Sequence, residues 1–142
     1  MENSHPVAKM LIEAHQGGET GNGGNGMTKH QEMENLLTQV VKENGLDGAV
    51  IADIEGLPLA SHLPPSVDED ELAAASAAIL SISDSKLTDG WKGGVVQLSV
   101  ESVDGYLVIK EVKGEYVISV VAPKSSKLGI VLSAVRSIER RL

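Results

Sequence analysis

The chain has 142 residues and a formal net charge of -8, with no cysteine, no phenylalanine, one tryptophan and two tyrosines. One domain with a short appendage is expected at this length. A chain without cysteine has no disulfide scaffold, thiolate metal site or cysteine nucleophile. The acidic balance argues against a protein that binds nucleic acid through its phosphates. No apolar run approaches about 18 residues, so we expect no membrane span and a cytoplasmic location.

Composition divides the chain into three segments. Residues 17–27 form a glycine-rich flexible linker, because residues 17–26 hold six of the fifteen glycines and no apolar side chain. Residues 28–142 form the folded domain. We expect a short amphipathic helix in residues 1–16 that docks on an apolar groove of the domain or on a partner, the alternative being a dispensable extension. Its apolar stripe consists of Val7, Met10, Leu11 and Ala14.

Apolar periodicity and capping signals predict eight elements in the domain. Thr28 to Gln31 is a T-x-x-Q capping box that begins the first helix, and Ser66 to Glu69 is a second capping box. Glycine-containing turns separate the strands. The expected elements are a helix ending at Asn44, strands 48–54 and 57–62, a helix over about 67–87, strands 95–101, 106–112 and 116–122, and a helix over about 126–142.

The order α-β-β-α-β-β-β-α predicts an α/β (α+β) fold, a five-stranded antiparallel sheet with helices on both faces. Residues 116–121 are almost continuously apolar, which is typical of a central strand. The strand at residues 95–101 is expected at the edge of the sheet, where unpaired backbone groups can pair with a second copy of the chain. We expect Val95, Gln97 and Ser99 to line this dimer edge.

No motif in the sequence specifies an active site. Gly21, Gly23 and Gly26 match G-x-G-x-x-G, but no βαβ unit surrounds them, and no P-loop motif occurs. The four histidines lack metal-ligand spacing, and the acidic run at residues 68–71 lacks the alternating oxygens of a calcium loop. We therefore predict a protein that is not an enzyme and has no catalytic residue, cofactor or metal.

The helix over residues 67–87 is the strongest candidate for an interaction surface, since residues 73–78 are all alanine or serine. Such small side chains permit close packing in the core. Alternatively, a long alanine-rich helix in so small a domain leaves one face for a partner. In this second interpretation the sheet-facing residues are Leu72, Ala75, Ile79 and Ile82. The predicted partner contacts are Ala74, Ala77, Ala78 and Ser81.

The segment AVIADIEGLPLAS at residues 49–61, the segment LAAASAAIL at residues 72–80 and the element order resemble the Roadblock/dynein light chain family, particularly its prokaryotic MglB-type members. The resemblance covers residues 28–142. It implies a profilin-like Roadblock sandwich that forms a homodimer, or a heterodimer with a second Roadblock protein. The dimer would join through the strand at 95–101, with the helices at 67–87 side by side.

The same resemblance implies a non-catalytic regulator or scaffold of a Ras-like small GTPase. The GTPase would dock on the face of the second helix, and members of the MglB type stimulate GTP hydrolysis. Two other classes remain open. One is a structural adaptor that bridges transport or signalling proteins without affecting a nucleotide cycle. The other is a small-ligand sensor, for which the sequence nominates no enclosed polar pocket.

The negative charge is concentrated in one part of the domain. Residues 28–95 hold four lysines and twelve acidic residues, whereas residues 96–142 hold seven basic and five acidic residues. If a partner docks on the second helix, we expect it to present a basic surface there, because opposite charges steer association.

Overall fold

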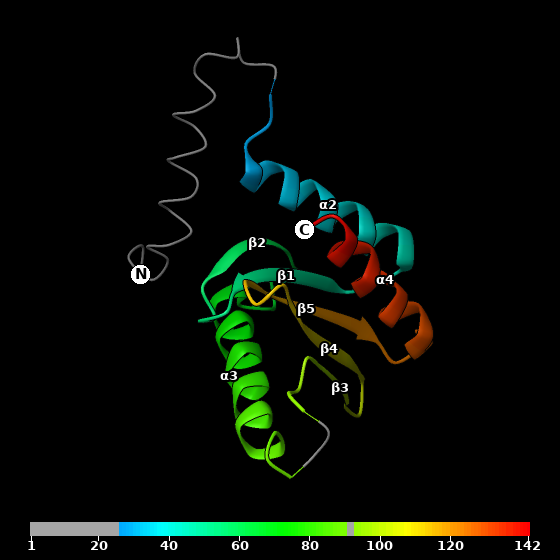
Figure 1. The fold of residues 1–142 in the computed structure, drawn as a ribbon. Coiled ribbons are helices and arrows are strands. Elements are labelled where there is room, and N and C mark those ends of the chain that lie inside the picture. Colours follow the sequence, from blue (N-terminus) through cyan, green and yellow to red (C-terminus); the bar gives the residue numbers. More distant parts are fainter. Residues whose placement is uncertain (1–25, 91–92) are drawn as a thin grey trace.

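A five-stranded antiparallel sheet organises the structure, a computed structural model that describes residues 26–90 and 93–142 (Figure 1). The predicted helix of residues 1–16 and most of the predicted linker lie outside the described residues. The predicted element order and fold class are confirmed. The elements are α2 (Lys29–Asn44), β1 (Gly48–Asp53), β2 (Pro58–His62), α3 (Glu69–Leu87), β3 (Gln97–Glu101), β4 (Gly105–Val112), β5 (Tyr116–Pro123) and α4 (Leu128–Arg140).

The strands lie in the order β2-β1-β5-β4-β3, so β5 is central and β3 is at an edge, as predicted. All four neighbouring pairs are antiparallel. The central register places Ile118 of β5 between Ile51 of β1 and Lys110 of β4. Ile51 and Ile118 are fully buried, because their side chains lie on the face of the sheet that α2 and α4 cover.

The helices divide between the two faces. Figure 1 shows α2 and α4 side by side on one face and α3 alone on the other. The face under α2 and α4 carries the largest core cluster, which includes Leu37, Ile51, Ile118 and Ile138. The face under α3 carries two smaller clusters, one of which joins Ala77 to the sheet. The core is therefore aliphatic and unequally shared between the faces.

The predicted capping box begins α2. The amide of Gln31 donates to Thr28 Oγ1 over 3.1 Å, and the amide of Thr28 donates to Gln31 Oε1 over 3.0 Å. Gly45 ends the helix with a φ of 64°, in the left-handed region that glycine adopts readily.

The predicted capping box at Ser66 is wrong. α3 begins two residues later, at an Asp68 N-cap whose Oδ1 accepts the amides of Asp70 (2.8 Å) and Glu71 (3.1 Å). Residues 64–67 instead form a turn, in which the amide of Val67 donates to the carbonyl of Pro64 over 3.0 Å. A carboxylate at the N-cap also complements the positive end of the helix dipole.

The turn between β1 and β2 packs directly against α3. Asp53 Oδ1 accepts the amides of Glu55 (2.9 Å) and Leu57 (3.0 Å), which shapes the turn. Gly56 has a φ of 94°, and a Cβ added to it would lie 3.0 Å from the Cα of Ala74. Only glycine fits this position without a shift of the backbone, so the approach of α3 depends on it.

We predict that Gly56→Ala destabilises the protein by about 2–4 kcal/mol, because it combines a strained left-handed backbone with a steric clash against α3. The matched control is Gly45→Ala, which also has a positive φ but has no atom within 4 Å of the added Cβ. The control should cost only about 1–2 kcal/mol. Urea denaturation measures both. Equal losses would show that the clash does not contribute.

Candidate interaction surface

α3 contacts the sheet through mostly small side chains. Ala77 and Leu80 form a buried cluster with Ile109 and Val117 of the sheet. The turn at Gly56 brings α3 close to the sheet, so most of the side chains that the helix buries are small. The buried residues of α3 are Ala73, Ser76, Ala77 and Leu80.

The predicted rotation of α3 is therefore wrong. Of the four residues expected on the sheet, only Leu72 packs against a core cluster. Ala75 is exposed, and Ile79 and Ile82 are exposed to 39% and 61%. The spacing of the large apolar residues predicted the wrong face of α3 as the buried one, because close packing depends on the size of a side chain as well as on its polarity.

The predicted partner contacts divide between surface and core. Ala74, Ala78 and Ser81 are exposed, whereas Ala77 is only 8% exposed and packs on the sheet. The two interpretations of the alanine-rich helix, core packing and partner contact, therefore each agree with part of α3. Close packing accounts for Ala77, and a small-residue surface is present at the three exposed positions. Contact of these residues with a partner stays a prediction.

Large apolar side chains are exposed on both α3 and the β3 segment. Leu98 of β3 pairs with Ile109 and packs against the α3 cluster. Side chains alternate along a strand, so Val100 lies on the same face as Leu98, and Val96 is exposed just before the strand. We use "the α3–β3 surface" for the exposed apolar residues that result, which are Ile79, Ile82, Leu87, Val96 and Val100. Such concentrations of apolar surface mark sites of interaction.

β3 leaves one edge of its backbone unpaired, since its ladder is formed with β4 alone. Gln97 and Ser99 of the predicted dimer edge lie in this strand and are exposed. Val95 does not lie in it, because its amide donates to Asp84 Oδ1 of α3 over 2.8 Å. The strand thus begins two residues later than predicted. Pairing of this edge with a second copy stays a prediction.

Side-chain contacts hold both ends of β3. At its beginning, Asp84 accepts the Val95 amide and the hydroxyl of Thr88 (3.1 Å). At its end, Lys124 Nζ donates to the carboxylate of Glu101 and lies 5.0 Å from the centroid of the Tyr106 ring. The hydrogen bond to Glu101 raises the pKa of Lys124 above its ordinary value. The edge strand is therefore positioned by Asp84 of α3 and by Lys124, which follows β5.

The sheet side of α3 also borders a hollow. The hollow beside it has a volume of about 200 Å³ and is open, with a lining that includes Ser81, Asp84 and Glu111. In residues 26–90 and 93–142, no three histidine or acidic side chains are arranged to hold a metal ion. No helix of the same residues is long and apolar enough to pass through a bilayer.

Comparison with known proteins agrees with this architecture. Residues 32–122 match the family model of the Roadblock/LC7 domain. Two uncharacterized proteins of Methanocaldococcus jannaschii are each 24% identical over 99 residues, which is 70% of this chain and 86% of theirs.

Solved structures share the fold at low sequence identity. MglB of Myxococcus xanthus superposes with a TM-score of 0.73 at 14% identity, covering 81% of this chain and 87% of that one. A structure of MglB with a tetrameric arrangement gives a TM-score of 0.71 at 18% identity, covering 78% and 85%. The Roadblock sandwich expected from the sequence is therefore confirmed.

We predict that Asp84→Ala loosens the beginning of β3, because the Val95 amide and the Thr88 hydroxyl lose a charged acceptor. The loss should be about 1–3 kcal/mol of unfolding free energy, with faster amide exchange at Val95 and Leu98. Asp89→Ala, in the exposed turn after α3, is the control and should change stability by less than about 0.5 kcal/mol. Equal exchange rates in the two variants would contradict the role of Asp84.

Proposed function

This chain belongs to the Roadblock/LC7 domain family, and on that premise we propose that it is a non-catalytic, dimeric cytoplasmic regulator or scaffold of a Ras-like small GTPase. The observation that carries the proposal is the α3–β3 surface, since α3 exposes isoleucine side chains and the β3 segment exposes both valine side chains and an unpaired strand edge. Exposure of apolar side chains to water is unfavourable in free energy, and a partner that covers them removes this cost.

The strand edge supports dimerisation through β3. Two copies related by a two-fold axis can pair their β3 strands antiparallel, which would continue the sheet across both subunits. This arrangement satisfies the free backbone groups of β3 and brings the exposed apolar residues on the α3 side of each sheet toward the other copy. Val100 and Ile79, each 39% exposed, would then lose water contact. One structurally similar protein, an MglB, has a tetrameric arrangement.

The small-residue face of α3 supports docking of the GTPase. Ala74, Ala78 and Ser81 are exposed and small, so a partner helix or loop can approach the backbone of α3 closely. The helix also begins with an acidic first turn, Glu69, Asp70 and Glu71, preceded by the Asp68 cap. Basic side chains on the GTPase would be attracted to this end of the surface.

We predict that Ile79→Glu raises the dissociation constant of the dimer at least tenfold, or about 1.4 kcal/mol, because it places a charge in an apolar interface. Ile130→Glu is the matched control. Ile130 is also a helical isoleucine, exposed to 45%, but it lies on α4, across the sheet from α3. Sedimentation equilibrium measures both. A wild-type chain that is monomeric at all concentrations would contradict the homodimer and leave the heterodimer with a second Roadblock protein.

We predict that the protein changes the single-turnover rate of GTP hydrolysis by a Ras-like small GTPase from the same genome by tenfold or more. Ala78→Arg should abolish the effect, since it fills the small-residue face with a bulky cation. Ser133→Arg, exposed on α4, is the control.

Two other results would change the proposal. Binding that Ala78→Arg disrupts, without any change in hydrolysis or nucleotide release, would support the structural adaptor. A rate change that both arginine variants retain would place the GTPase elsewhere on the domain.

A further inference from the structure

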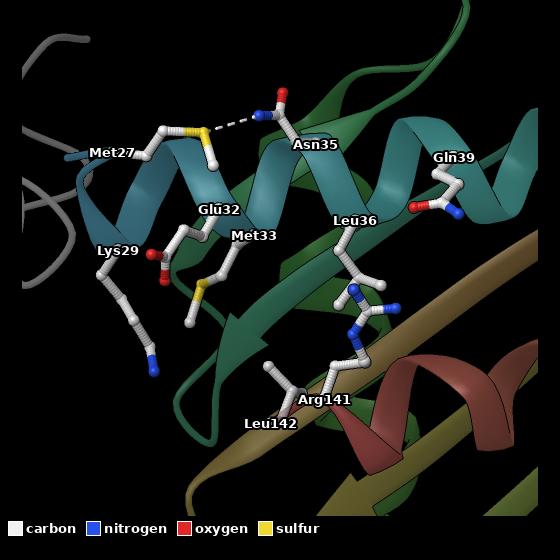
Figure 2. A pocket seen from close by; sticks show the side chains of 9 residues that line it. All are labelled: Met27, Lys29, Glu32, Met33, Asn35, Leu36, Gln39, Arg141 and Leu142. Atoms are coloured by element: carbon white, nitrogen blue, oxygen red, sulfur yellow. Dashed lines mark hydrogen bonds between the residues drawn. The ribbon is translucent and has the colours of Figure 1, made fainter. Parts of the chain in front are cut away.

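A second hollow lies between α2 and the end of α4, on the opposite side of the sheet from the α3–β3 surface. It is a groove of about 370 Å³. Figure 2 shows Met33 and Leu36 of α2 projecting toward Arg141 and Leu142 after α4, with the groove between them. Met33 and Leu36 are buried and form its floor, whereas Met27 on its rim is 49% exposed. The groove therefore has an apolar floor. Its rim is mixed, with Met27 and Leu142 beside the polar side chains of Lys29, Glu32, Asn35, Gln39 and Arg141.

The chain enters the described structure at this groove. Met27 follows directly on residues 1–26 and itself lines the groove. Its sulfur accepts a hydrogen bond of 3.0 Å from Asn35 Nδ2, so its side chain lies along α2 (Figure 2). Whatever precedes Met27 thus begins beside an apolar site.

We propose that residues 6–16 of the same chain dock in this groove as a helix and cover it. The apolar stripe of this segment, Val7, Met10, Leu11 and Ala14, has the spacing of one helix face. Eleven helical residues are about 16 Å long, and the groove side of α2 from Lys29 to Gln39 spans about 15 Å. The occupant and the groove therefore match in length, and the apolar stripe of the segment suits the floor formed by Met33 and Leu36.

Charge neither favours nor opposes this docking. Residues 6–16 hold one lysine, Lys9, and one glutamate, Glu13, and so carry no net charge. The groove itself is lined by the basic residues Lys29 and Arg141 and the acidic residue Glu32. The apolar stripe and the apolar floor of the groove therefore carry the proposal.

The linker makes weak docking sufficient. Ten residues of this composition at 17–26, acting as the flexible linker that the sequence predicts, would have a root-mean-square span of about 17 Å, which is comparable with the length of the groove. Such a tether would give an effective concentration in the millimolar range. A contact with a dissociation constant of about 1 mM would therefore already be substantially populated. This docking concerns residues 6–16 and the groove alone and does not rest on the proposed GTPase role.

The absence of cysteine permits a direct test by disulfide trapping in the full chain. Ala8→Cys is placed beside the apolar stripe and paired in turn with Asn35→Cys, on the groove, and with Glu34→Cys, which does not line the groove and lies about 100° around α2 from Asn35. The two α2 positions are adjacent, so an undocked tether reaches both equally. In a glutathione redox buffer, the equilibrium between thiols and disulfide gives the effective concentration of one cysteine at the other. We expect this value to be at least tenfold higher for Ala8→Cys with Asn35→Cys than for Ala8→Cys with Glu34→Cys.

A charged substitution added to the cysteine variants tests the stripe. Met10→Glu should reduce the preference for Asn35→Cys to less than twofold, whereas Ile12→Glu, which lies off the stripe, should leave it unchanged. Equal trapping of the two cysteine pairs, or a preference that survives Met10→Glu, would overturn the proposal. Cross-linked dimers in place of monomers would also overturn it, since they would assign the groove to the segment of a second copy.

Discussion

The contact between the β1–β2 turn and α3 is the constraint on which the rest of the structure depends. Gly56 lies so close to the helix that an added Cβ would be 3.0 Å from the Cα of Ala74 and 3.3 Å from the Cβ of Ala77. α3 therefore has to present small side chains inward. Its larger apolar residues, Ile79 and Ile82, remain on the outside. The packing of the core thus creates the exposed apolar surface on which we base dimerisation and partner binding.

The two faces of the sheet differ in how completely their apolar side chains are covered. Under α2 and α4 the core is large and closed, and its open feature is the groove beside Met27. Under α3 the clusters are small, and apolar side chains continue onto the edge strand. A docked N-terminal segment would complete the first face without obstructing the second. The chain itself would then cover the groove, and a partner would cover the α3–β3 surface.

The fold could be predicted almost completely from local signals, whereas the orientation of the candidate site could not. The Thr28 capping box and the turn chemistry place the elements, because these depend on residues near in sequence. The rotation of α3 depends on what it packs against. Ala77 is buried and Ile79 is exposed because of a turn more than fifteen residues earlier, and no periodicity within the helix contains that information. Val95 is similarly taken out of the edge strand by Asp84.

The sequence by itself determined the order of the elements, the aliphatic core, the edge position of β3 and the resemblance of the chain to the Roadblock family, since hydrophobic periodicity, turn residues and local motifs encode all of these. Only the tertiary structure decided which face of α3 is free and that Met27 borders a groove. These properties arise from the distance between elements that are far apart along the chain. That distance is set by close packing. Because Gly56 has no Cβ, α3 approaches the turn closely and buries small side chains there, although burial of Ile79 and Ile82 would remove more apolar surface from water.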